Sequence, residues 1–322
     1  MKCIVVYYSQ TGNTEIIAKS IHRGIEKAAG NCDLLPIKEA NPRRLYGYDL
    51  IGLGSPVHDH VEPKNVTAFL KDMRFVGGKH AFCFCTHATH GDFYPPSVAP
   101  QLKSRGLVYI GVYDCYAPCY LPHEPEPFIT AGHPDDIDLK ESEEFGKKMV
   151  ELSGRIYAGE TNLIPPIPDY PPPGLEEFRK ENKKGMQKLV EMGVPPAKAY
   201  HTAKMTIDSK KCLYPECRLC MDNCPMDGID LSIKPPIVGH PCMGCHFCPM
   251  VCPTGAIVDE VEMLPQEISL PNPGENYIRW AAEAEATGKF RRLVPLENID
   301  WDNPIYKKHN KHPQWIIGKG LV

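Results

Sequence analysis

The fold is decided near the start of the chain by the stretch Cys3-Ile4-Val5-Val6-Tyr7-Tyr8-Ser9-Gln10-Thr11-Gly12-Asn13-Thr14. Its first five residues form an apolar run, rich in β-branched and aromatic side chains, that predicts a buried strand. A helical pattern of apolar residues follows from Thr14 to Ala29. The polar residues in between therefore form a turn from a strand into a helix, where backbone amides and the helix dipole favour an anion.

This turn carries hydroxyl side chains and no positive charge. Ser9, Thr11 and Thr14 can donate to phosphate oxygens, and Asn13 can add its side-chain amide. Gly12 permits a tight backbone path close to a ligand. No lysine follows the glycine, as a Walker loop would require. A helix N-cap accounts for one hydroxyl residue but not for three, so the turn predicts a site for a phosphate monoester held by neutral donors.

Short apolar strands alternate with helical stretches up to about residue 155, which predicts an α/β fold with a mostly parallel, doubly wound sheet. We expect five strands, at Cys3–Tyr8, Cys32–Ile37, Leu50–Gly54, His80–Cys85 and Leu107–Tyr113. We expect helices at Thr14–Ala29, Val66–Met73 and Leu139–Tyr157. In such a sheet a ligand lies beyond the carboxyl ends of the strands, so the loops after the third and fourth strands should flank it.

Residues Tyr8 to Glu15 resemble the FMN phosphate loop of flavodoxins. The resemblance implies a flavodoxin-like five-stranded sheet and an FMN cofactor, whose phosphate would be held by Ser9, Gln10, Thr11, Gly12, Asn13 and Thr14. It also implies that the two flanking loops line the isoalloxazine ring through Ser55, Pro56, Val57, His58, Thr86, His87, Ala88, His90, Gly91 and Tyr94. Each of the histidines can instead be an ordinary polar loop residue.

Two features of these loops set limits on the interpretation. Tryptophan is absent from this part of the chain, so histidines stand where some flavodoxins place a tryptophan against the ring. The run from Gly52 to Val57 lacks the third glycine of a dinucleotide fingerprint, and no helix begins there. We therefore find no NAD-binding motif.

Eight of the fourteen cysteines lie between Cys212 and Cys252. The run Cys242, Cys245, Cys248, Cys252 and Pro253 has the spacing C-x2-C-x2-C-x3-C-P of bacterial ferredoxins. An upstream run of Cys212, Cys217, Cys220 and Cys224 matches this spacing, except that four residues and not two separate its first pair. We expect a strand at Met205–Asp208 before these runs and a turn and strand at Thr254–Ile257 after them.

The segment resembles a complete small ferredoxin, which implies two [4Fe-4S] clusters. The family's crossed ligation assigns Cys212, Cys217, Cys220 and Cys252 to one cluster, and Cys242, Cys245, Cys248 and Cys224 to the other. Cys212 departs from the family's spacing, so its place among the ligands stays open. Zinc held by paired cysteine knuckles is the alternative. The six remaining cysteines are expected to be buried as free thiols.

Four consecutive segments follow from these patterns. We expect a flavodoxin-like FMN domain over residues 1–158, a proline-rich linker with a charged helix over 159–204, an α+β ferredoxin-like domain over 205–262 and an irregular aromatic extension over 263–322. The linker should be extended at Ile164–Pro173 and helical at Leu175–Met192. The extension holds all three tryptophans. We expect it to cover a domain and bury its rings, with partner docking as the alternative.

The formal charge of −4 and pI near 6.4 give none of the basic excess that nucleic acids demand. No apolar run approaches the roughly 18 to 20 residues of a membrane span, and no targeting segment is recognised, so we expect a cytoplasmic protein. FMN can accept two electrons and release them singly, whereas each cluster passes one.

The resemblance to flavodoxin-ferredoxin fusions therefore implies an electron-transfer iron-sulfur flavoprotein, which relays low-potential electrons to or from a larger oxidoreductase or a ferredoxin. The alternatives are an FMN-dependent reductase of an organic substrate and a redox sensor. Assembly as a homo-oligomer stays open.

Overall fold

The computed structural model describes residues 1–121, 124–169, 175–191, 205–239, 241–259 and 274–304. The chain divides into two compact units, and both are discontinuous in sequence. The first consists of Met1–Cys119, Ile129–Pro173 and Trp280–Pro295, and the second of Tyr120–Phe128, Gly174–Arg279 and Leu296–Val322. The predicted C-terminal extension is therefore shared between the units, because Trp280–Pro295 belongs with the N-terminal residues.

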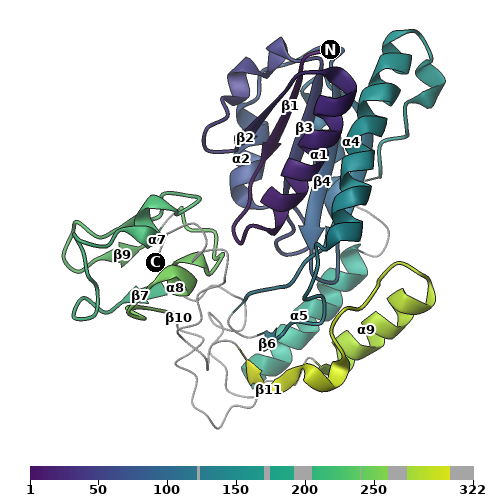
Figure 1. The fold of residues 1–322 in the computed structure, drawn as a ribbon. Helices are drawn as coiled ribbons and strands as arrows, with labels where there is room; N and C mark the ends of the chain where they lie inside the picture. The colour runs from purple at the N-terminus through teal and green to yellow at the C-terminus, as the bar shows by residue number, and fades with distance from the viewer. Residues whose placement is uncertain (122–123, 170–174, 192–204, 240, 260–273, 305–322) are drawn as a thin grey trace. The chain divides into compact units, whose positions relative to one another are not determined.

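The first unit is built on a five-stranded parallel sheet in the order β2-β1-β3-β4-β5 (Figure 1). The strands are β1 (Cys3–Tyr7), β2 (Cys32–Pro36), β3 (Leu50–Pro56), β4 (His80–His87) and β5 (Val108–Tyr116). Cys3 pairs with Cys32 on one side and with Leu50 on the other. The chain therefore moves outward from β1 to β2 and returns on the far side of β1. This order confirms the predicted flavodoxin-like fold and sets the switch point between β1 and β3.

Helices cover both faces of this sheet. They are α1 (Asn13–Ala29), α2 (Lys64–Asp72), α3 (Tyr94–Ser104) and α4 (Asp136–Tyr157), with 3-10 turns η1 (Pro42–Gly47) and η2 (Thr161–Leu163). Because parallel crossovers are right-handed, α1 lies on the face opposite α2 and α3. Helix α4 packs along α1 (Figure 1). Their backbones approach closely, since a Cβ at Gly146 would collide with the Ile21 carbonyl.

One core cluster of this unit lies between the sheet and the α1–α4 layer. Its members are almost entirely buried side chains such as Val5, Ile17 and Phe84. Gly52 and Gly54 fall inside β3, where a Cβ would strike the rings of Phe82 and Phe84 respectively. The glycine pattern that superficially resembles a dinucleotide fingerprint is therefore explained by packing within a strand.

Helix α3 is absent from the sequence prediction, which assigned the residues before Tyr94 to a loop and expected no helix after them. The segment Tyr94–Ser104 contains three prolines, which normally argue against a helix. Pro95 and Pro96 occupy the first turn, where the missing amide hydrogen costs nothing because it would have no intrahelical acceptor. Pro100 lies inside the helix.

The second unit contains the cysteine-rich region. Strand β7 (Met205–Ile207) pairs antiparallel with β10 (Ile257–Asp259), and β8 (Ile229–Asp230) pairs with β9 (Ile237–Val238). Both strands expected around the cysteine runs are thus confirmed. Short helices α7 (Leu219–Asp222) and α8 (Phe247–Val251) each carry a cysteine of one run.

Further elements are η4 (Leu296–Asn298), α5 (Leu175–Glu191) and the antiparallel pair β6 (Pro125–Glu126) and β11 (Asp300–Pro304). Helix α9 (Gly274–Ala286) belongs to the first unit from Trp280 onward.

Several sequence predictions lie partly outside the described residues. The charged helix expected to end at Met192 is described to Glu191. Of the expected extended segment Ile164–Pro173, residues 164–169 are described, and they form no helix or strand. Trp315 and Tyr306 of the aromatic extension are not among the described residues. Among the helices that the structure describes, none combines the length and apolar character needed to cross a bilayer.

Candidate functional site

The turn between β1 and α1 lies at the switch point of the sheet. Gly12 is in the left-handed region, with φ 90° and ψ −23°, and it is the N-cap residue of α1. Its backbone N–H donates to Ser9 Oγ over 3.1 Å. In the described structure no side chain caps the helix at this position. The start of α1 therefore has no side-chain cap at Gly12, which is the arrangement that a helix N-terminus offers to a phosphate.

The hydroxyl residues of this turn play different parts. Thr11 and Asn13 are half-buried, and the Asn13 side-chain amide donates to Thr11 Oγ1 over 3.5 Å. Thr14 is buried, and its Oγ1 lies 2.7 Å from Thr86 Oγ1 at the end of β4. One of these two hydroxyls donates to the other. The pair ties the phosphate loop to the loop that follows β4, a connection that the sequence alone did not predict.

The loop after β3 lies against the same edge of the sheet. Val57 donates its backbone N–H to the Thr86 carbonyl over 2.9 Å. Ser55 Oγ lies 3.1 Å from the Tyr94 hydroxyl, and both residues are fully buried. Pro56, Val57 and His58 are half-buried. Tyr94 was expected to flank a flavin ring, but in this structure it has no exposed surface and supports Ser55 from the core.

A tight turn carries further histidines at this edge. His58 and Val61 exchange backbone hydrogen bonds, and Asp59 and His60 between them have positive φ angles of 47° and 71°. The His60 ring lies 5.3 Å from that of His90 and 5.9 Å from that of Phe93. The sequence prediction stopped at His58 and missed His60, although the alternation His58-Asp59-His60 was visible.

Burial controls the protonation of these rings. Burial, together with the nearby His90, lowers the pKa of His60, and burial likewise lowers the pKa of His90. Both imidazoles are therefore neutral at neutral pH, so each can donate a proton from one nitrogen and accept one at the other.

His87 ends β4 and is buried. Its Nε2 lies 3.3 Å from Asp114 Oδ2, and this hydrogen bond holds the pKa of Asp114 below its usual range. Gly91 packs on the ring, since a Cβ there would lie 2.6 Å from His87 Cδ2. His87 Nδ1 is buried and, among the described residues, has no hydrogen-bond partner. Buried polar atoms are normally satisfied, so a ligand or an ordered water is expected at this nitrogen.

The loops that carry the predicted flavin residues are thus brought together at one edge of the sheet. The phosphate loop supplies uncapped amides, and the loops after β3 and β4 supply half-buried side chains and an unsatisfied nitrogen. These features fit a ligand with an anionic end and a flat polar ring. Of the predicted residues, Pro56, Val57, His58, Ala88, His90 and Gly91 retain exposed surface, whereas Ser55, Thr86, His87 and Tyr94 are buried.

The eight clustered cysteines surround two cavities in the second unit. The first is lined by Cys224, Cys242, Cys245, Cys248 and also Cys220. The second is lined by Cys212, Cys217, Cys220 and Cys252. The last cysteine of each run therefore joins the first three of the other run, as the crossed pattern predicts. Cys212 faces its cavity despite the longer spacing to Cys217.

The spacing of the sulfurs bears on zinc as the alternative occupant. Four thiolates at about 2.3 Å from one tetrahedral zinc ion lie only about 3.8 Å from one another. Among the described residues, the one group of three or more imidazole, thiol or carboxylate atoms lying within 4.8 Å of one another contains no cysteine. The wider cysteine quartets suit a cluster, which places an iron beside each sulfur and inorganic sulfide in the centre.

Hydrogen bonds reach several of these sulfurs. Backbone amides donate to Cys224 Sγ from Gly228 over 3.2 Å and to Cys252 Sγ from Ala256 over 3.2 Å. The hydroxyl of Thr254 lies 3.6 Å from Cys252 Sγ. Such contacts stabilise negative charge on sulfur and tune bound metal centres.

The raised pKa values of the cavity cysteines indicate which kind of ligand the cavities can hold. Burial, followed by the neighbouring cysteines, raises the pKa of Cys220 and of Cys245 to about 12. As free thiols these groups would stay neutral, so they can serve as thiolates only beside a compensating cation. Cys242 alone among the fourteen cysteines is exposed, which places one rim of the first cavity at the surface.

Comparisons with known proteins agree with a flavodoxin-like part and a ferredoxin-like part of the chain. The family model described as a flavodoxin domain matches residues 4–93. An uncharacterized protein of Methanocaldococcus jannaschii is 29% identical over 155 residues, which are 47% of this chain and 99% of the relative. A flavodoxin of Clostridium beijerinckii is 24% identical over 151 residues, 46% of this chain and 99% of that protein. An uncharacterized ferredoxin of M. jannaschii is 40% identical over 60 residues, 18% of this chain and 97% of that protein.

Proposed function

This chain belongs to the flavodoxin-ferredoxin fusion proteins, and from that premise we propose that it relays electrons between FMN and two [4Fe-4S] clusters held on one polypeptide. Electron transfer is the activity that both kinds of domain have in common. FMN exchanges electrons in pairs or singly and each cluster exchanges one, so their combination links two-electron donors to one-electron acceptors.

The residues of the first unit would hold FMN at its phosphate and at its isoalloxazine ring. The uncapped amides after Gly12 and the hydroxyl of Thr11 would bind the phosphate. The half-buried Val57 and His58, and the loop from Ala88 to Gly91, would lie beside the ring. His87 Nδ1 offers an additional hydrogen-bonding atom. Together these groups bind and orient the cofactor and shield one of its edges from water.

The residues of the second unit would hold the two clusters in the crossed arrangement. Cys212, Cys217, Cys220 and Cys252 would ligate one cluster, and Cys224, Cys242, Cys245 and Cys248 the other. The observation that carries the proposal is the exchange of the last cysteines: Cys224 lines a cavity with Cys242, Cys245 and Cys248, and Cys252 lines a second one with Cys212, Cys217 and Cys220. Cys220 also borders the first cavity. A single shared cavity, or cysteines scattered over the surface, would not support it.

Cofactor analysis of anaerobically purified protein tests the proposal. About one FMN and eight iron atoms per chain are expected. Released flavin is measured by fluorescence after denaturation, and iron and zinc are measured by elemental analysis of the same sample. Zinc in place of iron, together with no released flavin, would contradict both halves of the proposal.

The partner would be a larger oxidoreductase or a ferredoxin in the cytoplasm. One observation favours a second function, that of an FMN-dependent reductase of an organic substrate. The pair His60 and His90, with ring centroids 5.3 Å apart at the candidate flavin edge, is neutral and can donate a hydrogen bond to a substrate or accept a proton from it. Replacing both by Gln separates the two functions. A reductase should lose turnover of its organic substrate, whereas electron exchange with a protein partner should be unchanged.

A further inference from the structure

The first unit includes a segment from the far end of the chain, Trp280–Pro295, here named the C-terminal strap. Its Phe290 is buried, and the Phe290 ring lies 4.9 Å from Tyr116 at the end of β5. The Trp280 ring lies 5.8 Å from Tyr116 and 5.1 Å from Phe290. Two large aromatic residues of the strap therefore cover the last residue of β5.

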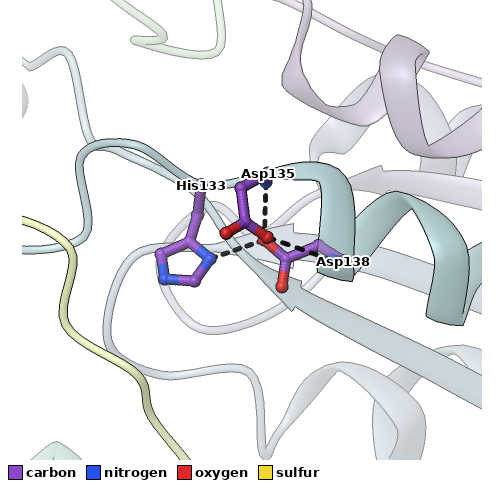
Figure 2. Close-up of side chains that lie close together, drawn as sticks. All are labelled: His133, Asp135 and Asp138. Atoms are coloured by element: carbon purple, nitrogen blue, oxygen red, sulfur yellow. Dashed lines mark hydrogen bonds and ion pairs between the residues drawn. The ribbon is translucent and has the colours of Figure 1, made fainter.

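His133 joins the strap to the start of α4, and Figure 2 shows the α4 side of this junction. Its Nδ1 lies 2.6 Å from Asp138 Oδ2, and its Nε2 lies 2.7 Å from the backbone carbonyl oxygen of Arg291. Both partners are oxygen acceptors, so both ring nitrogens must carry hydrogen. The geometry therefore describes a charged imidazolium that joins helix α4 to the strap.

The side chain of Arg291 completes this junction. Its guanidinium lies 2.8 Å from Asp135 Oδ1 and 3.7 Å from Asp138 Oδ1. Asp135 also caps α4 by accepting the backbone N–H groups of Ile137 and Asp138. The carboxylates are thus already paired with an imidazolium, a guanidinium and helix amides. These contacts account for the gathering of His133, Asp135 and Asp138 as an ionic junction.

The strap also contacts Tyr116, which packs against His87 at the start of the candidate flavin loop. The ring of Tyr116, which Phe290 and Trp280 cover, meets His87 edge-on at 4.7 Å. His87 in turn packs against Gly91 and bonds to Asp114. A continuous series of packed rings therefore runs from the strap through Tyr116 to the residue that begins the loop.

We propose that the C-terminal strap is a positioning element for the loop at residues 87–93, and that the charged form of His133 holds it in place. The identity of that loop as a flavin loop rests on the proposed function. The packing contacts between the strap and the loop do not depend on whether flavin binds there. Residues that follow the ferredoxin-like region in sequence thereby complete the flavodoxin-like unit. Loss of the strap contacts should loosen the loop without unfolding the sheet.

The junction should depend on pH in a defined direction. Burial disfavours the charge on His133, but the hydrogen bonds to Asp138 and the Arg291 carbonyl outweigh it and raise its pKa above the usual value. Asp135, Asp138 and Arg291 supply the charged groups that lie nearest the ring. Tyr116 stays neutral there, because burial raises its pKa to about 12. The attachment is therefore complete below the usual histidine pKa and is lost as the pH rises through the raised one.

Hydrogen exchange on the full chain tests the proposal without requiring bound flavin. Arg291→Ala removes the side chain that reaches the α4 carboxylates. Arg292→Ala is the matched control, because Arg292 pairs with Glu285 inside the strap. Backbone amides of residues 87–93 should lose protection by about 2- to 5-fold in Arg291→Ala, the range for a partly exposed ion pair, and should be unchanged in Arg292→Ala.

The wild-type protein provides a second test that needs no substitution. Protection factors of residues 87–93, which are corrected for the intrinsic pH dependence of exchange, should fall as the pH is raised from 6 to 9. His133→Gln should abolish this dependence. Equal protection in Arg291→Ala, Arg292→Ala and wild type, with no pH dependence, would overturn the inference. Failure of wild-type protein to bind FMN would instead overturn the proposed function and leave the exchange result standing.

Discussion

Replacing Thr254 by valine should lower the reduction potential of one cluster and leave the other unchanged. The Thr254 hydroxyl lies 3.6 Å from Cys252 Sγ. Cys252 lines the same cavity as Cys212, Cys217 and Cys220. A hydrogen bond to sulfur favours the reduced cluster, because reduction adds negative charge. A bond to a charged acceptor contributes about 1.5 kcal/mol at its weak end. We take the bond to stabilise the reduced cluster more than the oxidised one by about half of this energy. Removing the bond then lowers the reduction potential by about 30 mV.

The assay is a redox titration of the anaerobic protein followed by electron paramagnetic resonance, which separates the two clusters. Thr254→Ser is the control, since it keeps the hydroxyl and should keep the potential. Thr254 is half-buried, so valine of similar shape should not disturb the fold. The reasoning is refuted if neither potential moves, if both move equally, or if serine shifts the potential as much as valine does.

Three further substitutions test other parts of the molecule. Cys212→Ala should remove about one to four iron atoms per chain and spare FMN; an unchanged iron analysis would exclude Cys212 as a ligand. Thr11→Val should weaken FMN binding about 10-fold by removing a donor to the phosphate, and full affinity in a fluorescence titration would contradict the phosphate site. Gly146→Ala should cost about 1–3 kcal/mol in urea unfolding, because its Cβ would strike the Ile21 carbonyl. The control is Gly154→Ala in the same helix, where a Cβ has no neighbour within 4 Å. Alanine there should be neutral or stabilising by up to about 1 kcal/mol, and equal effects of the two substitutions would contradict the close packing of α4 on α1.

The parallel sheet could be predicted from the sequence because each of its strands is locally recognisable. A strand buried on both faces appears as a continuous apolar run, and all five runs became strands with ends shifted by a few residues. Helix α3 could not be predicted in the same way, because its three prolines argue against a helix. The helix can form because two of the prolines lie in its first turn, where an amide hydrogen would have no intrahelical acceptor.

The parts of the candidate sites that are contiguous in sequence could be predicted, whereas the contacts between distant residues could not. The phosphate loop and the cysteine runs are contiguous in sequence, so their residue types and spacing could be recognised. The bond between Thr14 and Thr86 joins residues 72 positions apart, and the contact of Phe290 with Tyr116 joins even more distant ones. No local pattern encodes such pairs. For the same reason the sequence predicted that the aromatic extension would cover a domain but not that the strap reaches the end of β5.

The most direct test of the account is whether electrons pass between the cofactors inside one chain. Anaerobic holoprotein would be mixed rapidly with a limiting one-electron donor, and cluster and flavin absorbance followed with time at several protein concentrations. If transfer occurs within one chain, flavin reduction should follow cluster reduction at a rate that does not change with protein concentration. A flavin that stays oxidised, or a rate proportional to concentration, would contradict it.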